Sequence, residues 1–275
     1  MAVVVSTNVS SLEAQRNLYK NQKALGASFE RLSSGFRVNT AADDAAGLAV
    51  SESMKSKIRS FTVAERNAAD GVSMAQTAEG ALGEIHDILG RMRELGVQAS
   101  NGSLSDTDRG YLNTEFGQLK NEITRIQGST QFNGVNLIGT SASSVSFQIG
   151  LDNVANDQLS VSFGGLDLSA VTAAGNGVGT LATAQASLAI SDTARGSVSN
   201  SRAGFGAVMN RLDIATANIQ TMRLNLSAAN SRIRDVDVAD ETARLSRNQV
   251  LTQAGVSMLA QANGLPQLAF GLIGG

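Results

Sequence analysis

The chain has 275 residues and a formal net charge of −2, and only 4% of its residues are aromatic. It contains no cysteine, which excludes disulfides, cysteine-based zinc sites and thiol catalysis. It has no block of basic residues and no stretch approaching the ~18 apolar residues that span a bilayer. We therefore expect neither a nucleic-acid nor a membrane partner.

The N-terminal residues, 1–15, lack the basic region, the apolar run and the cleavage site of a secretory signal peptide. If the protein is exported, we expect a different export machinery. Residues 10–33 are predicted to form an amphipathic helix. Four large apolar residues share one stripe of this helix: Leu18, Leu25, Phe29 and Leu32.

A short charged segment interrupts the helical pattern after Gly35. It carries Arg37 and the adjacent acids Asp43 and Asp44, before helical spacing resumes at Ala45. Adjacent acids could form an acid–base pair or a cation site. More often such acids stabilise a helix N-terminus, and we expect that role here.

The strongest signal is a 3,4 alternation of apolar or small residues from Phe61 to Ala99. It predicts one helix of roughly 40 residues, roughly 60 Å long, that offers a seam to other helices. The only histidine, His86, lies beside this seam. A lone histidine supports neither a catalytic triad nor a metal site, so we interpret it as a flanking helical residue.

Two further runs follow the same spacing. The run at 112–126 predicts a second helix that ends before Gly128 and packs antiparallel to the first. The run at 208–236 extends over more than three heptads and predicts a coiled-coil helix, which we expect to begin near residue 183.

The segment between the second and third runs has strand signals. Asn133-Gly134 is a strong turn signal. Alternating apolar residues at 145–149 and 159–163 predict two short strands joined by a polar turn. Residues 164–182 are rich in Gly, Ala and Thr, and we expect an exposed, loosely specified connection there.

The C-terminal part mirrors the N-terminal part. A second charged break at 231–246 precedes a second amphipathic helix at 240–262 and a small, apolar tail at 265–275. We expect the two breaks to lie side by side and the apolar ends to be buried against other copies. The acids of the second break resemble a calcium loop only superficially: Asp235, Asp237, Asp240 and Glu241.

These patterns predict a mainly α fold, a long coiled-coil-like helical bundle with a terminal helix hairpin and a small β-hairpin insert. No zinc-protease, serine-hydrolase or phosphate-loop motif is present in the sequence. We therefore expect no enzyme, no cofactor and no metal, and we expect self-association to be the function.

Several stretches closely resemble the signatures of bacterial flagellins. The N-terminal ones are ERLSSGFRVNTAADDAAGLAVSE at 30–52, RNAADGVSMAQTAEGALGEI at 66–85, RMRELGVQAS at 91–100 and TQFNGVNLI at 130–138. The C-terminal one is SRIRDVDVADETARLSRNQVLTQAGVSMLAQAN at 231–263. The central region, where flagellins vary, is minimal here, so the chain resembles a short form of the family.

The resemblance implies a domain layout. Residues 1–35 and 240–275 would be inner-tube terminal helices, and 36–56 and 231–239 would be connecting segments. The outer-shell bundle would comprise 57–138 and 183–230, and the β-hairpin with a variable linker would occupy 139–182.

The resemblance also implies a function and partners. The chain would be a structural subunit that polymerises with itself into the extracellular flagellar filament for motility. It would leave the cell unfolded through the flagellar type III export apparatus with a secretion chaperone. Filament cap and hook-associated proteins would be further partners.

The resemblance further implies candidate contact residues. Flagellins are often detected by Toll-like receptor 5, and the matching positions are Arg91, Leu95 and Glu115. Gly90 and Gly96 depart from the bulkier residues of many agonist flagellins.

The first break would be the joint between the inner and outer helices. Four charged residues of this joint are predicted to contribute to filament stability: Arg31, Arg37, Asp43 and Asp44.

Two alternatives stay open. A hook–filament junction protein shares the terminal helices but polymerises little. A protease inserted in 139–182, as some flagellins carry, is disfavoured because the insert is short and lacks a zinc-binding motif.

Overall fold

The computed structural model describes residues 7–273, with side chains up to residue 264. The apolar tail predicted at 265–275 therefore lies outside the described side chains. The chain divides into two compact units. Unit 1 combines Met1–Ser56 with Asn225–Gly275, and unit 2 is Lys57–Leu224.

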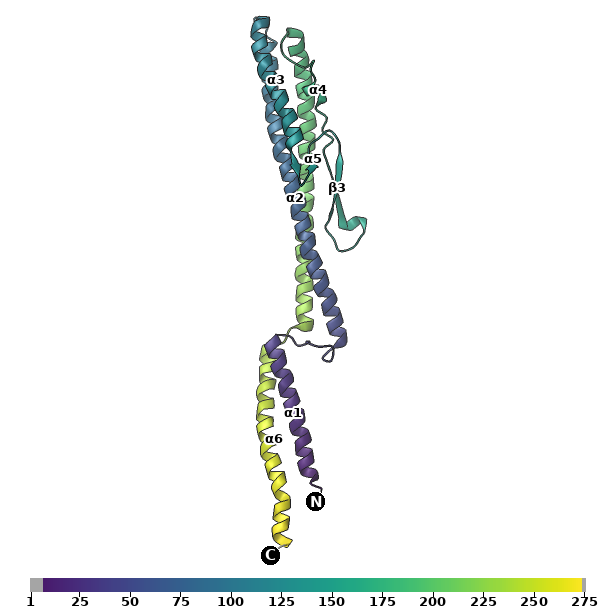
Figure 1. Ribbon diagram of the computed structural model, residues 1–275, viewed down its shortest axis with the longest axis vertical. Helices are drawn as coiled ribbons and strands as arrows, with labels where there is room; N and C mark the ends of the chain where they lie inside the picture. Colours follow the sequence, from purple (N-terminus) through teal and green to yellow (C-terminus); the bar gives the residue numbers. More distant parts are fainter. Residues whose placement is uncertain (1–6, 274–275) are drawn as a thin grey trace. The chain divides into compact units, whose positions relative to one another are not determined.

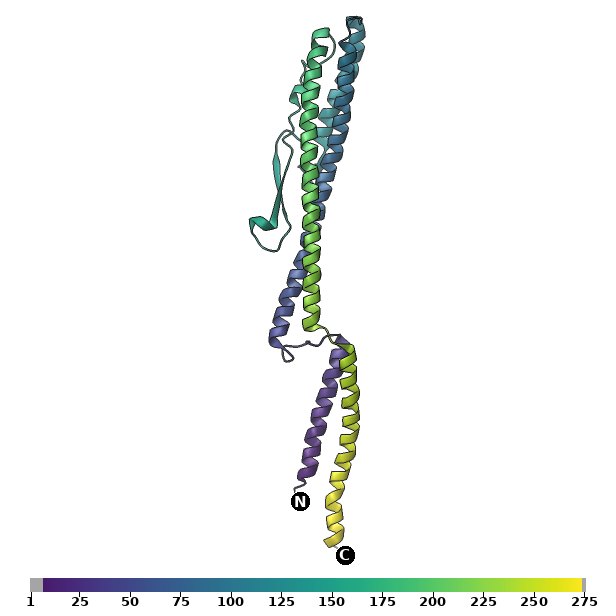
Figure 2. The same cartoon turned by 180° about the vertical axis from the view of Figure 1, so that it is seen from behind.

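Unit 1 contains a terminal helix pair, α1 (Val9–Ser34) and α6 (Val238–Ile273), which lie side by side in Figures 1 and 2. Helix α6 is longer than the predicted 240–262. A hydrogen bond joins the two helices near the N-terminus of α1, where Asn8 Nδ2 donates to the Ala262 carbonyl at 2.8 Å. Close packing also requires a small residue, because a side chain at Gly255 would meet Leu18 at 3.3 Å.

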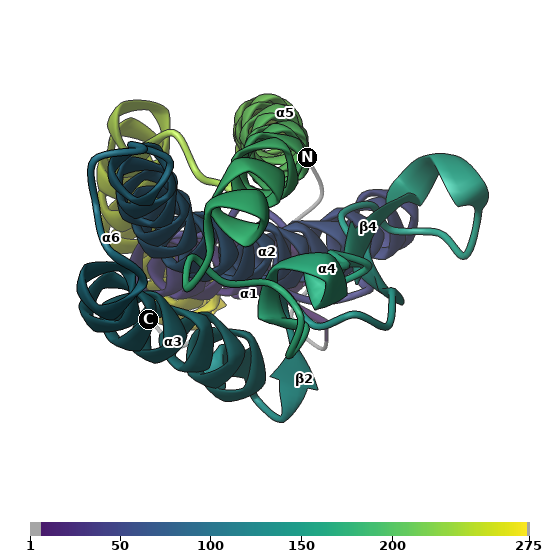
Figure 3. The same ribbon diagram turned by 90° about the horizontal axis from the view of Figure 1, so that it is seen from above.

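Three long helices supply most of unit 2: α2 (Ala45–Ala99), α3 (Asp106–Ser129) and α5 (Leu181–Arg234). Figure 3 looks along these helices and shows them as neighbouring rods. At 55 residues α2 is longer than predicted, because the segment after Ala45 continues the helix without a break. The predicted connecting segment 36–56 is thus partly helical.

The expected end of α3 before Gly128 is wrong. The helix continues through Gly128 to Ser129, and the Thr130 N–H still donates to the Ile126 carbonyl at 3.0 Å. Asn136 Nδ2 donates to the Gln127 carbonyl at 3.0 Å. These bonds satisfy carbonyls of the last turn, and they offset the roughly 1 kcal/mol that glycine costs in a helix.

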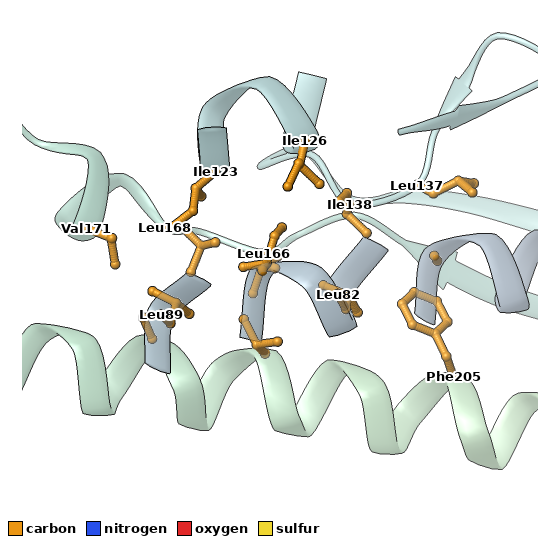
Figure 4. Packing of buried hydrophobic residues seen from close by; sticks show 14 of the residues in the cluster. Leu82, Leu89, Ile123, Ile126, Leu137, Ile138, Leu166, Leu168, Val171 and Phe205 are labelled. Carbon is orange, nitrogen blue, oxygen red and sulfur yellow. The ribbon is translucent and has the colours of Figure 1, made fainter. Parts of the chain in front are cut away.

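The predicted seam of α2 is the centre of the core. Leu82, Ile85 and Leu89 are 0% exposed. All twelve residues of the 3,4 alternation are buried: Phe61, Ala64, Ala68, Gly71, Ala75, Ala78, Leu82, Ile85, Leu89, Met92, Gly96 and Ala99. Figure 4 shows Leu82 and Leu89 packed against side chains of α3 and of the segment after it.

The seam predicted for α5 is only partly buried. Leu212 and Ile219 are buried, but Met222 is 54% exposed. Nearer its N-terminus α5 packs through a stripe of mostly small residues: Ala184, Ser187, Ser191, Ala194 and Val198.

The β element is two small antiparallel hairpins. Strands β3 (Ser143–Gln148) and β4 (Gln158–Phe163) pair as the alternation predicts, with Val145 opposite Val161. Strands β1 (Gln131–Phe132) and β2 (Val135–Asn136) are joined by Asn133-Gly134. Both turn residues have positive φ, 47° and 79°, as a type I′ turn requires.

The expectation of an exposed connection at 164–182 is only partly right, because many of its residues are exposed but its large apolar residues are buried. Leu166, Leu168, Val171 and Val178 are at most 5% exposed, and a short helix, α4 (Ser169–Thr172), forms there. These four apolar residues are separated by small residues, so the overall composition of the segment does not predict that they are buried. The segment covers the α2–α3 core that Figure 4 shows.

Lys120 of α3 ties this segment down by donating to the carbonyls of Ala173 and Asn176, at 2.5 and 2.8 Å. Its pKa is lowered by partial burial.

We predict that Leu89→Ala lowers the free energy of unfolding of unit 2 by about 2–5 kcal/mol, because it leaves a cavity in a fully buried layer. Leu224→Ala, at a position 70% exposed, is the control and should change it by less than about 0.5 kcal/mol. Denaturant unfolding followed by circular dichroism measures both. Equal effects would contradict the assignment of the core.

Candidate functional site

The two breaks meet within unit 1, in a joint formed by residues 35–44 and 235–237. Gly35, with φ 74°, ends α1 in the left-handed region. Its carbonyl then accepts from the Val236 N–H at 3.0 Å, and the Arg37 N–H donates to the Arg234 carbonyl at 2.6 Å. Phe36 and Asp235 form an antiparallel bridge. The expectation that the breaks lie side by side is therefore confirmed.

Two arginines hold the end of α5. Arg37 Nη2 donates to the Ile233 carbonyl at 2.5 Å. Arg234 stacks on the Phe36 ring at 4.5 Å and its Nη1 donates to Glu52 at 2.6 Å. Both cations lie at the helix C-terminus, where the helix dipole favours positive charge. Arg234 and Phe36 were not predicted as joint residues, because nothing in their spacing marks a pair so distant in sequence.

The adjacent acids Asp43 and Asp44 have different roles. Asp44 Oδ1 accepts from the Gly47 N–H at 2.8 Å and so caps the start of α2. Asp43 instead closes the turn before it, accepting from the N–H and the hydroxyl of Thr40, both at 3.0 Å. These bonds from Thr40 lower the pKa of Asp43, with smaller contributions from Asn39 and Arg31.

Arg31 lies between two carboxylates. Its Nη2 is 3.4 Å from Asp43 Oδ1, and its Nη1 is 3.9 Å from Glu241 Oε2. The Glu241 side chain of α6 is almost fully buried, at 6% exposure. A cavity of about 280 Å³ opens beside this group, between the joint and the first turns of α6.

The terminal helix pair exposes an apolar surface. Two helices bury only the stripe between them, so the remaining apolar residues face outward. On α1 the exposed ones are Val9, Leu12, Tyr19 and Phe29. On α6 they are Val238, Val250, Leu251, Val256 and Met258. Tyr19 is 70% and Met258 is 63% exposed, and no other described segment of the chain covers this surface.

The second candidate surface lies on α2 and α3. Arg91 Nε donates to Glu115 Oε1 at 2.8 Å, and Arg91 Nη1 donates to Glu94 Oε2 at 3.1 Å. The bonds to Glu115 and then Glu94 raise the pKa of Arg91. Arg91 and Glu115 are both about half-exposed, whereas Leu95 is 1% exposed. Leu95 belongs to the buried core, so it supports the helix from beneath and offers no surface to a partner in this conformation.

The two glycines near Arg91 have different surroundings. Gly90 has open space around it. Gly96 faces inward, because a side chain there would lie 2.9 Å from Ser187 Oγ and 3.0 Å from Leu188 Cδ2. Gly96 therefore permits close approach of α2 and α5 rather than removing area from an outer surface.

The described residues show no sign of other kinds of site. Within 7–273 no helix is long and apolar enough to cross a membrane. No cluster of three or more His, Asp or Glu side chains that could hold a metal ion occurs in the described part of the chain.

Two family models match most of the chain. The bacterial flagellin N-terminal helical region matches residues 5–143, and the bacterial flagellin C-terminal helical region matches 188–273. The chain belongs to the bacterial flagellin family. As a flagellin, it is a structural protein of the bacterial flagellum.

Relatives align over almost the whole length. A flagellin of Halalkalibacterium halodurans is 41% identical, covering 98% of this chain and 100% of the relative. The flagellar filament 30.7 kDa core protein of Treponema maltophilum is 42% identical, covering 95% of this chain and 96% of the relative.

Two solved structures share the fold. The crystal structure of Bacillus cereus flagellin has 35% identity and a TM-score of 0.50, covering 60% of this chain and 94% of that one. A hook-associated protein from Vibrio parahaemolyticus has a TM-score of 0.59 at 16% identity, covering 70% of this chain and 100% of that one. The latter likeness shows the fold alone. The filament subunit is the better-supported reading because full-length identity is with flagellins.

We predict that the Asp43 turn weakens in acid. A lowered pKa in the folded chain means that its stabilising contribution is present above the ordinary aspartate pKa and lost as pH falls through the lowered value. Amide exchange of Asn39 and Thr40, corrected for its intrinsic pH dependence, should show protection that is unchanged near pH 6 and falls once the pH drops below about 4.

Asp43→Asn should remove this pH dependence. Asp108→Asn is the control, since Asp108 also has a lowered pKa but caps α3 through Ser105, away from the joint. A pH dependence at Thr40 that survives in Asp43→Asn would contradict this role.

Proposed function

We propose that this flagellin polymerises with itself into the extracellular filament that drives motility, and that the terminal helix pair makes the central contacts. The exposed apolar surface on α1 and α6 carries this proposal. An isolated helix pair of this kind is marginally stable, and association with other copies would bury the surface that it leaves open. The relative in Treponema maltophilum bears the name of a filament core protein, which supports the same role.

In the proposed filament, residues 1–35 and 240–275 line the inner tube, and 36–56 with 231–239 connect them to the outer shell. Helices within 57–138 and 183–230 form that shell, with the hairpin and linker at 139–182. The joint residues Arg31, Arg37, Asp43 and Asp44 fix the connection. The ion pair of Arg31 with Glu241 and the hydrogen bonds of the other three residues to Ile233, Thr40 and Gly47 support this assignment.

We further propose export in an unfolded state through the flagellar type III apparatus, with a secretion chaperone before passage and the cap and hook-associated proteins after it. The absence of cysteine from the sequence supports this route, because no disulfide must form after export.

We predict that deleting residues 240–275 abolishes filament formation while unit 2 keeps its helical content. Leu251→Asp tests the same surface with one substitution, since Leu251 is 44% exposed on α6. It should prevent filaments while leaving monomer unfolding unchanged. Gln253→Asp, an exposed polar neighbour, is the matched control. Electron microscopy and sedimentation measure assembly, and normal filaments from the truncated chain would contradict the proposal.

A second contact is proposed with Toll-like receptor 5, through Arg91 and Glu115, with Leu95 as the buried support beneath them. The two charged side chains come from adjacent helices and hold each other at 2.8 Å, so they present a fixed, half-exposed polar pair. Such preorganised arginines are common at the centres of protein interfaces.

Arg91→Ala should raise the flagellin concentration that gives half-maximal receptor signalling by about fivefold or more, which corresponds to ~1 kcal/mol. Arg125→Ala is the control, because Arg125 forms a comparable exposed pair with Glu122 on α3. A cell reporter assay of monomeric protein measures both. Equal potency of the wild-type protein and Arg91→Ala would contradict the proposed receptor contact through Arg91.

A further inference from the structure

The cavity at the joint is lined by charged groups of both signs. Four carboxylates and three guanidiniums surround it: Arg31, Arg37, Asp43, Asp237, Asp240, Glu241 and Arg244. Most of them are occupied within the chain. Arg244 pairs with Asp240 at 2.9 Å, and Asp237 Oδ1 accepts from the N–H groups of Ala239 and Asp240 at the start of α6.

Glu241 is the exception. Its side chain is 6% exposed, and within the described residues its carboxylate accepts no hydrogen bond, the nearest cation, Arg31 Nη1, being 3.9 Å away. The same guanidinium also serves Asp43 at 3.4 Å. Arg31 Nε is buried without a partner. One guanidinium thus serves two carboxylates at the outer limit of ion pairing, and an ionised carboxylate can accept about four hydrogen bonds.

The residues near the cavity indicate where a further donor to the Glu241 carboxylate would come from. Val238, one turn before Glu241 on the same side of α6, is 59% exposed. A second copy that covers Val238 would also displace water from the cavity beside it. A carboxylate without water and without donors is unfavourable, so the covering chain must supply a donor.

We propose that a lysine or arginine from the terminal helix pair of a second copy enters this cavity and pairs with Glu241. The proposal rests on the proposed polymerisation and names the partner of the joint within it. The covering surface carries suitable cations. Lys20, Lys23 and Arg247 lie on α1 and α6, and within the described residues none of them forms an ion pair.

The test compares assembly with monomer stability. Glu241→Gln keeps the size of the side chain and removes its charge. It should raise the critical concentration for polymerisation about tenfold, measured by sedimentation, and leave the thermal unfolding of the monomer unchanged. Glu122→Gln makes the same substitution on α3, outside the cavity, at a partly exposed residue that is paired with Arg125. Its critical concentration should stay within about twofold of wild type.

A double-mutant cycle then identifies the donor. Lys20→Met, Lys23→Met and Arg247→Met are each combined with Glu241→Gln. In one combination the second substitution should add no further rise in critical concentration, because the pair is already broken. Additive effects in all three combinations would overturn the proposal.

The remaining outcomes distinguish the proposed Glu241 pairing from the proposed polymerisation. Assembly of Glu241→Gln at the wild-type critical concentration would overturn the pairing while leaving polymerisation intact. A fall in monomer unfolding temperature that accounts for the lost assembly would also overturn it, since the pair would then lie within one chain. Wild-type protein that forms no filaments would overturn polymerisation and the pairing together.

Discussion

A pair of helices can bury only one stripe of each helix, and this constraint explains why the two units differ in how much apolar surface they bury. In unit 2, α2 contacts α3, α5 and the segment at 164–182, so its seam is closed within one chain. In unit 1, α1 and α6 have only each other, and large apolar side chains remain outside. Unit 2 therefore has a core of its own, whereas unit 1 leaves apolar surface exposed that we propose other copies cover.

The joint makes that arrangement possible because it satisfies the backbone where the helices stop. Helix ends leave unpaired carbonyls and N–H groups. Here the carbonyls of Gly35 and Arg234 accept from Val236 and Arg37, so each break supplies the partners of the other. The charged side chains then complete the capping. Most charged side chains at the joint therefore cap helix ends within one chain. Glu241 differs from them, because among the described residues its carboxylate has only the Arg31 guanidinium at 3.9 Å as a partner.

The sequence predicted what depends on regular spacing. The 3,4 alternation located the buried face of α2, and period-two alternation located β3 and β4, because burial follows periodicity directly. It failed where burial depends on distant partners. Leu166 and Val178 sit among small residues and are buried by the core they cover. Leu95 was assigned to an outer surface through family resemblance, although it is 1% exposed and packs in the core. The role of Glu241 depends on Arg31, 210 positions away, and no local pattern reveals it.

The central claim is that the apolar surface of the terminal helix pair is buried between copies. A cryo-electron microscopy map of the assembled filament tests it most directly. The account predicts that Tyr19, Val250 and Met258 lie against α1 or α6 of neighbouring subunits, around the inner tube. A filament in which these side chains face solvent, while contacts between subunits come from unit 2 alone, would contradict it.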